Sequence, residues 1–154
     1  MALSTTIAVG DPLPATLNAT NLAVNQLIDG TGWRDISTLL ANGWVLDSGG
    51  FIRLIRRGRR ATILFAGLNG STATGSTIIP TTSLAGFRPA TDARVTLWQN
   101  ATPFAGTVSA SSNGGGLVTA ARVTHGSQQQ ELTWEVNPAT AWPASTALPG
   151  TAIA

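Results

Sequence analysis

Short runs of β-branched and apolar residues alternate along this 154-residue chain with turns that contain glycine and asparagine. Such runs are typical of strands. Two of them, residues 51–56 and 60–66, flank Arg57-Gly58-Arg59, where Gly58 supplies the positive φ of a tight hairpin turn. About six or seven short strands joined by turns predict an all-β fold, an antiparallel β-sandwich or a barrel-like head. The other expected strands are residues 33–37, 93–100, 104–110, 117–124 and 130–136.

The beginning of the chain has a different pattern. A stiff Asp11-Pro12-Leu13-Pro14 connector precedes apolar residues spaced by three and four, which predict a helix that Gly30 ends. An isolated helix of this length is marginal in water, so it must pack on a partner surface. We therefore expect an N-terminal anchoring arm and short helix in residues 1–31 and a β-sandwich head in residues 32–154. The stripe consists of Leu17, Asn21, Val24, Leu27 and Ile28.

Three further segments lack a strong periodic pattern. Ser48-Gly49-Gly50 is expected to be a turn. The Thr- and Ser-rich residues 69–83 form the longest expected loop, of a length that is often functional or covered by a neighbour. Residues 137–154 contain three prolines and are expected to be an extended tail on the surface.

The composition excludes several kinds of chemistry. Because the chain has no cysteine, it has no disulfide, no zinc–thiolate site and no thiol nucleophile. The net charge of +2 does not indicate a nucleic-acid-binding protein. No apolar run approaches the roughly 20 residues of a membrane-spanning helix, and residues 1–10 do not resemble a secretory signal. We expect no membrane association and synthesis in a cytoplasm.

The candidates for catalysis are few. The single histidine, His125, precedes Gly126-Ser127 and is expected to be a solvated loop residue. Glu131 and Glu135 are four residues apart on one strand, which separates them by about 13 Å, too far for a glycosidase pair. We therefore expect no enzymatic activity, no cofactor and no metal site.

Five of the nine basic residues crowd the hairpin around Gly58. Protein–protein contact, simple solvation of the hairpin tip and nucleic-acid binding are the alternatives. Nucleic-acid binding would require aromatic residues interleaved with the charge, so we expect no such partner. We favour contact with another protein through Arg56, Arg57 and Arg59. The five residues are Arg53, Arg56, Arg57, Arg59 and Arg60.

Tryptophan is the other notable residue type, with five in the chain. Trp134 shares a face with Leu132 and Val136 and is expected in the core. Trp98 lies on the more polar face of its strand and Trp142 lies in the tail, so these two are candidates for stacking on a glycan. Burial in the core or in a subunit interface is the alternative for each tryptophan.

Four segments carry a resemblance to known proteins. They are residues 32–36 (GWRDI), 49–58 (GGFIRLIRRG), 84–89 (LAGFRP) and 142–151 (WPASTALPGT). They resemble the β-structured head domains at the ends of minor tail proteins, fibres and head-decorating proteins of phages of actinobacteria. The resemblance implies a trimeric β-sandwich in which the Gly-Phe-Arg-Pro loop precedes a core strand and the proline-rich tail packs last.

Within that group, a short anchoring arm before a compact head favours a capsid decoration protein. It would be a homotrimer that binds the major capsid protein and stabilises the assembled shell by mass action. The helix stripe would then lie at the trimer axis, with Asn21 setting the register, or it would pack on its own head.

Two other functions stay open at this point. One is a receptor-binding protein of the tail tip or fibre that recognises a glycan of the host surface. The other is an independent lectin or hydrolase, which rests only on scattered acids and tryptophans. In both phage interpretations the protein is made in the host cytoplasm, released by lysis and displayed on the virion surface.

Overall fold

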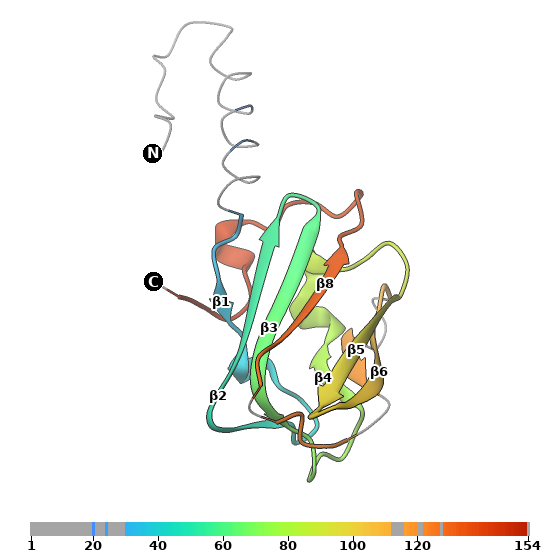
Figure 1. Cartoon of the computed structure of the whole chain (residues 1–154). Coiled ribbons are helices and arrows are strands. Elements are labelled where there is room, and N and C mark those ends of the chain that lie inside the picture. Colours follow the sequence, from blue (N-terminus) through green and yellow to red (C-terminus); the bar gives the residue numbers. More distant parts are fainter. Residues whose placement is uncertain are drawn as a thin grey trace, which may run out of the picture.

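The computed structural model describes residues 20, 24, 30–111, 116–119, 122–126 and 128–153. Two antiparallel sheets pack together, so the expected all-β sandwich is confirmed (Figure 1). Sheet A has the strand order β8-β3-β2-β1-β9 and sheet B the order β4-β7-β6-β5. The strands are β1 (Arg34–Asp35), β2 (Val45–Arg57), β3 (Arg60–Asn69), β4 (Thr77–Pro80), β5 (Ala93–Gln99), β6 (Thr102–Val108), β7 (Gly116–Thr119), β8 (Gln130–Glu135) and β9 (Thr151–Ala152). The 3-10 helices are η1 (Ser37–Leu39), η2 (Thr81–Phe87) and η3 (Ser145–Ala147).

The predicted hairpin around Gly58 is confirmed as β2–β3, which forms the centre of sheet A. The expected turn at residues 48–50 is wrong, because β2 runs through it with a β-bulge between Leu46 and Phe51. Gly50 suits this bulge: a Cβ there would lie 2.9 Å from the Asp47 carbonyl oxygen and 3.0 Å from that of Ala66. The glycines therefore allow close backbone approach within a strand and do not end it.

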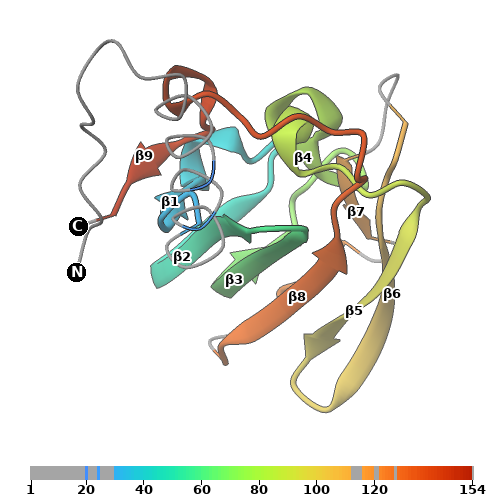
Figure 2. The ribbon, with the colours of Figure 1, turned by 90° about the horizontal axis from the view of Figure 1, so that it is seen from above.

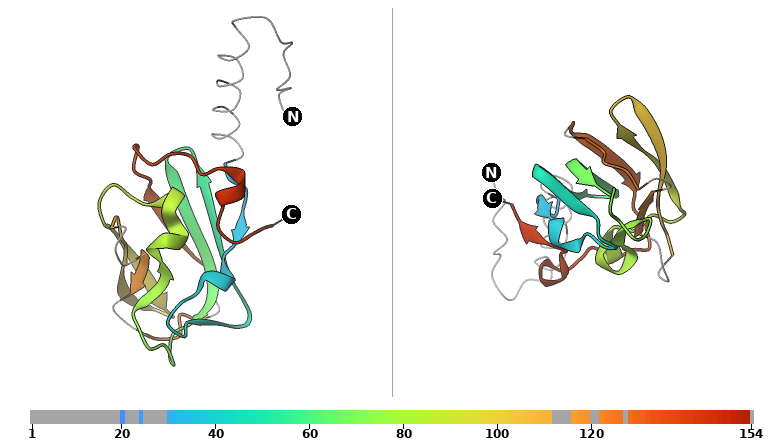
Figure 3. Two further views of the ribbon diagram at one scale, coloured as in Figure 1. Left: turned by 180° about the vertical axis from the view of Figure 1, so that it is seen from behind. Right: turned by 90° about the horizontal axis from the view of Figure 1, so that it is seen from below.

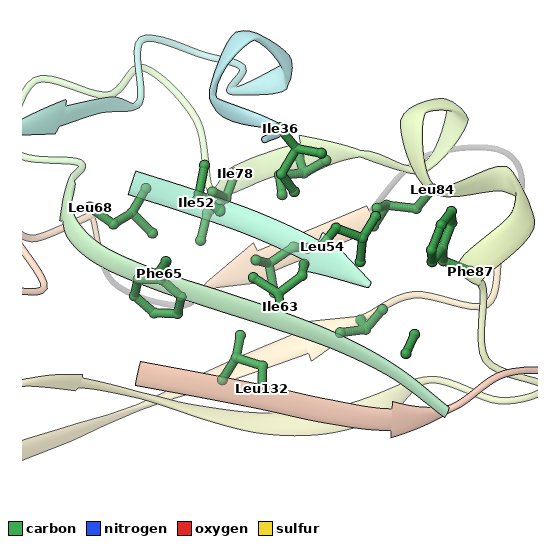
Figure 4. Packing of buried hydrophobic residues seen from close by; sticks show 14 of the residues in the cluster. Ile36, Ile52, Leu54, Ile63, Phe65, Leu68, Ile78, Leu84, Phe87 and Leu132 are labelled. Atoms are coloured by element: carbon green, nitrogen blue, oxygen red, sulfur yellow. The ribbon is translucent and has the colours of Figure 1, made fainter. Parts of the chain in front are cut away.

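The core fills the space between the sheets (Figure 4). Alternate residues of β2 and β3 point inward, among them Leu54 and Phe65, and Leu97 faces them from β5. Each of these three side chains is fully buried, which stabilises the fold by about 1.5–3 kcal/mol per side chain. Trp134 is buried as expected, and its indole N–H donates to the Phe87 carbonyl oxygen at 2.6 Å.

The Gly-Phe-Arg-Pro segment, residues 86–89, joins the two sheets. Phe87 is fully buried at the end of η2, which lies beside β4 and β7 (Figure 3). The Arg88 carbonyl oxygen accepts a hydrogen bond of 2.9 Å from the backbone N–H of Asn137, and Pro89 forms an isolated bridge with Val136. This segment lies three residues before β5, so it holds the start of β5 near the end of β8.

Two segments that were expected to be irregular contain strands. In the tail, β9 pairs with β1, and Arg34 donates to the Pro149 carbonyl oxygen at 3.0 Å (Figure 2). The Thr- and Ser-rich loop contains β4, which pairs with β7 and buries Ile78 and Ile79. These strands have two and four residues and lie at sheet edges, where proline and short apolar runs are tolerated.

Candidate functional site

Arg56 does not belong to the exposed arginine cluster in which the sequence placed it. Its side chain is 5% exposed and faces the same side of β2 as Leu54. The guanidinium donates hydrogen bonds to the carbonyl oxygens of Gly58 (3.0 Å), Gly86 (2.6 Å), Ala141 (3.2 Å) and Thr140 (3.4 Å). The expectation of a particle contact through Arg56 is therefore wrong, because its donors tie β2 to the Gly-Phe-Arg-Pro segment and the tail.

Trp142 packs on this buried cation. The Arg56 guanidinium carbon lies 4.7 Å from the centroid of the Trp142 ring. Because one face of the indole is occupied in this way and the residue is only half exposed, Trp142 is a poor platform for a sugar ring. The structure assigns it to the same network as Arg56.

The turn of the β2–β3 hairpin nevertheless carries exposed cations, and we call residues Arg57–Arg60 the arginine hairpin. Arg57 and Arg60 lie directly opposite each other in the strand register, an arrangement that is destabilising for like charges. Arg59 forms an ion pair of 2.9 Å with Glu135, and both side chains are more than half exposed. Arg57 and Arg60 have no ion pair in the described part of the chain. Arg57 and Arg60 therefore leave the hairpin with positive charge that no described acid pairs with.

Residues 30–31, which precede β1, contact sheet A at the same end as the arginine hairpin. The backbone N–H of Thr31 donates to the Arg56 carbonyl oxygen at 2.8 Å, and its hydroxyl accepts from the Arg56 N–H at 3.0 Å. Residues 30–31, which connect the head to the preceding segment, therefore lie at the base of the arginine hairpin. We call this the hairpin end of the sandwich.

A second exposed surface lies on sheet B, and we call it the Trp98 face. Trp98 is 45% exposed, as the sequence pattern predicted, and pairs in register with Pro103. Two further cross-strand pairs point outward on the same side of β5 and β6. They are Thr96 with Ala105 and Arg94 with Thr107.

The Trp98 face begins at the opposite end of the molecule from the arginine hairpin. Gln130, the first residue of β8, accepts a hydrogen bond from the Trp98 N–H and donates one to its carbonyl oxygen, both at 2.7 Å. At the other end of β8, the Val136 N–H donates to the Arg59 carbonyl oxygen at 2.7 Å. The strand rise puts these two contacts about 20 Å apart. In Figure 1 the β2–β3 turn is at the top and the β5–β6 turn at the bottom.

The predicted helix stripe lies mostly outside the described residues. This holds for Leu17, Asn21, Leu27 and Ile28. Val24 is helical and half-buried. The role of the stripe at a trimer axis stays a prediction.

His125 is not the solvated loop residue that the sequence indicated, since it is 1% exposed. Its ring stacks on Trp44 at 6.0 Å and meets the edges of two phenylalanines, Phe65 and Phe104. Nδ1 lies 3.2 Å from the Trp98 carbonyl oxygen, whereas Nε2 has no hydrogen-bond partner among the described residues. Burial lowers the pKa of His125, and the contact with the Trp98 carbonyl partly offsets that effect.

Four of the described acids accept hydrogen bonds or form an ion pair. Glu131 accepts from the Thr133 hydroxyl at 3.0 Å, and Glu135 is paired with Arg59. Asp47 and Asp92 accept local hydrogen bonds of 2.8 Å, from the Asn69 side chain and the Ala110 backbone. Among the residues with described positions, no three histidine, cysteine or acidic side chains come together as metal ligands.

A search of those residues finds no helix long and apolar enough to cross a membrane. No protein-family model, no curated protein and no solved structure matches the chain.

Proposed function

We propose that this chain is a structural, non-enzymatic protein of the phage virion surface, and specifically a homotrimeric capsid decoration protein. The observation that carries the proposal is that residues 30–31 and the arginine hairpin lie at the same end of the sandwich. An anchoring segment and the cations of the arginine hairpin, two of which pair with no described acid, can then meet one acidic particle surface together. The major capsid protein is the expected partner.

The hairpin is suited to such a contact for an electrostatic reason. Arg57 and Arg60 repel each other in the free protein, and an acidic partner relieves that repulsion when it binds. Arginine also forms bidentate hydrogen bonds with carboxylates, which define the orientation of the partner and add to the binding affinity. Binding only to the assembled shell would stabilise that shell by mass action.

Gold-labelled antibody against the chain, applied to intact virions and viewed by electron microscopy, tests the location. Gold spread over the heads is the expected result. Gold confined to the tail tip would replace the decoration role with receptor binding, and particles without any gold would overturn the virion role altogether.

A binding experiment then tests the surface. Purified shells that lack the protein are mixed with the full chain or with the double variant Arg57→Gln/Arg60→Gln, and bound protein is measured after sedimentation. We expect the double variant to bind at least tenfold more weakly. The matched control is Arg94→Gln, which removes a cation from the outer face of sheet B instead. Equal loss in both variants would contradict a specific role of the hairpin. Light scattering of the full chain should give three times the chain mass.

Receptor binding at the tail tip is the second candidate, and one observation favours it. Trp98 is a large apolar side chain left exposed at the end of the sandwich away from the arginine hairpin. A head attached by the hairpin end would present that side chain outward.

A further inference from the structure

We propose that the Trp98 face binds an anionic polysaccharide, with a sugar ring stacked on Trp98 and an acidic substituent held by Arg94. The acidic group is a carboxylate or a phosphate, which a guanidinium recognises in the same way. The inference rests on the receptor-binding candidate above and does not depend on attachment through the arginine hairpin.

Trp98 provides the stacking platform. It is exposed on the flat outer face of sheet B, and its cross-strand neighbour is Pro103. The electron-rich face of an indole attracts the weakly positive C–H groups of a sugar ring, and stacking leaves the sugar hydroxyls in water. The Trp98 backbone is held by the Gln130 side chain through two hydrogen bonds, so the platform is fixed in position.

Small side chains lie between this platform and the Arg94 cation. The pair between Trp98 and Arg94 on the outer face is Thr96 with Ala105, two small side chains. Beyond it lies a shallow depression of about 380 Å³, whose lining includes Arg94, Thr107 and Val118. The strand rise separates Arg94 from Trp98 by about 13 Å, enough for a chain of more than one sugar ring.

The orientation and the free charge of Arg94 suit the binding of an anion. Its guanidinium donates to the Thr107 hydroxyl at 3.0 Å, which orients it on the sheet surface. It has no ion pair within the described part of the chain, and no acid lines the depression. Asp92, two residues earlier on the same side of the strand, accepts hydrogen bonds from Ser109 and Ala110 instead.

The composition of the face favours a glycan over a second protein copy. Trp98 is its single aromatic side chain, and the remaining outward residues of β5 and β6 are small, polar or charged. The centres of protein–protein interfaces combine several large apolar anchors and exclude charge. A face with one aromatic platform, small side chains and one cation is better matched to a sugar chain.

The test measures binding of the purified full chain to three immobilised polymers: polygalacturonate, poly(glycerol phosphate) and neutral dextran. We expect binding to one or both anionic polymers and none to dextran. The polymer that binds identifies carboxylate or phosphate as the acidic group. Trp98→Ala and Arg94→Gln should each weaken binding at least tenfold. Ala105→Glu adds a negative charge between Trp98 and Arg94, and it should abolish binding to the anionic polymers.

The control is the double variant Arg57→Gln/Arg60→Gln, which should bind the polymers like the parent chain. Loss of binding in this control with retention in Arg94→Gln would overturn the proposal, as would equal binding to dextran or no binding to any polymer. A change of oligomeric mass in Trp98→Ala would assign the face to a contact between copies. Because this assay uses no particles, its failure leaves the gold-labelling result standing, and the reverse also holds.

Discussion

Two polar side chains are buried at opposite ends of the sandwich, and their hydrogen bonding differs sharply. At the hairpin end, the Arg56 guanidinium donates to four carbonyl oxygens and packs on Trp142. At the Trp98 end, His125 has one contact, with the Trp98 carbonyl oxygen, and its Nε2 has no partner among the described residues. Three aromatic rings surround it.

The difference shows how each end is held together. A buried charge is tolerated when hydrogen bonds compensate the loss of water, as they do for Arg56. A half-satisfied imidazole in an apolar site is tolerated in its neutral form, because protonation adds a buried charge that the contact with the Trp98 carbonyl oxygen only partly compensates. The hairpin end therefore depends on a polar network, whereas the Trp98 end depends on aromatic packing and on the charge state of one ring.

The largest expected effect is the loss of the Arg56 network. Arg56→Met keeps much of the volume but removes every donor, which leaves the carbonyl oxygens of Gly86, Thr140 and Ala141 without this partner. Since hydrogen bonds from a charged donor each contribute about 1.5–3 kcal/mol, we expect the free energy of unfolding to fall by about 3 kcal/mol or more. Urea unfolding followed by tryptophan fluorescence measures the change.

Arg57→Met is the matched control, since the neighbouring side chain is exposed; its effect should stay within about 0.5 kcal/mol. Arg56→Lys should destabilise almost as much as the methionine variant, because an ammonium group cannot reach the same set of carbonyls. If Arg56→Met proved as mild as its control, the network would not hold the tail and the comparison of the two ends would fail.

The next effect is a dependence of stability on pH that originates at His125. Because burial lowers its pKa below the ordinary 6.5, the unfolded chain takes up a proton before the folded chain does. The stabilisation of the fold by neutral His125 is complete above a pH of about 6.5. It is lost as the pH falls from there toward the lowered pKa of His125 in the folded state. Unfolding midpoints should therefore decrease between pH 7 and pH 5.

His125→Phe removes the titrating group and retains an aromatic ring beside Trp44. The midpoints of this variant should change little over the same pH range, in which Asp and Glu remain largely ionised. The same slope in variant and parent would show that the acid sensitivity originates elsewhere. The phenylalanine also lacks the contact with the Trp98 carbonyl, so its stability at pH 7 reports the strength of that contact.

The fold class follows from local pattern, since alternation and turn residues fix strands such as β5, β8 and the β2–β3 hairpin. The short strands β4 and β9 were missed because two to four residues carry too little periodicity, and long-range pairing alone defines them.

Arg56 and His125 were misplaced for a related reason. Arg56 stands among exposed arginines, and three of the four carbonyls that accept its hydrogen bonds are 30, 85 and 84 residues away in the sequence. The available clue was the two-residue period of the strand, which puts Arg56 on the same face as Ile52 and Leu54. For His125, the aromatic residues that enclose it come from β3, β6 and the segment before β2, so the local turn pattern could not reveal its burial.

The smallest expected effect on the free energy of unfolding is at Trp98, where the backbone and the side chain have different surroundings. The backbone groups bind His125 and Gln130, whereas the indole is exposed. Trp98→Ala keeps the backbone bonds, so the free energy of unfolding should change by no more than about 0.5 kcal/mol, and the pH dependence should persist. Gln130→Ala removes two hydrogen bonds to the Trp98 backbone and one to the His125 carbonyl oxygen, and should cost about 1 kcal/mol. A larger loss in Trp98→Ala than in Gln130→Ala would mean that the indole is needed for the fold, and would argue against a side chain reserved for binding.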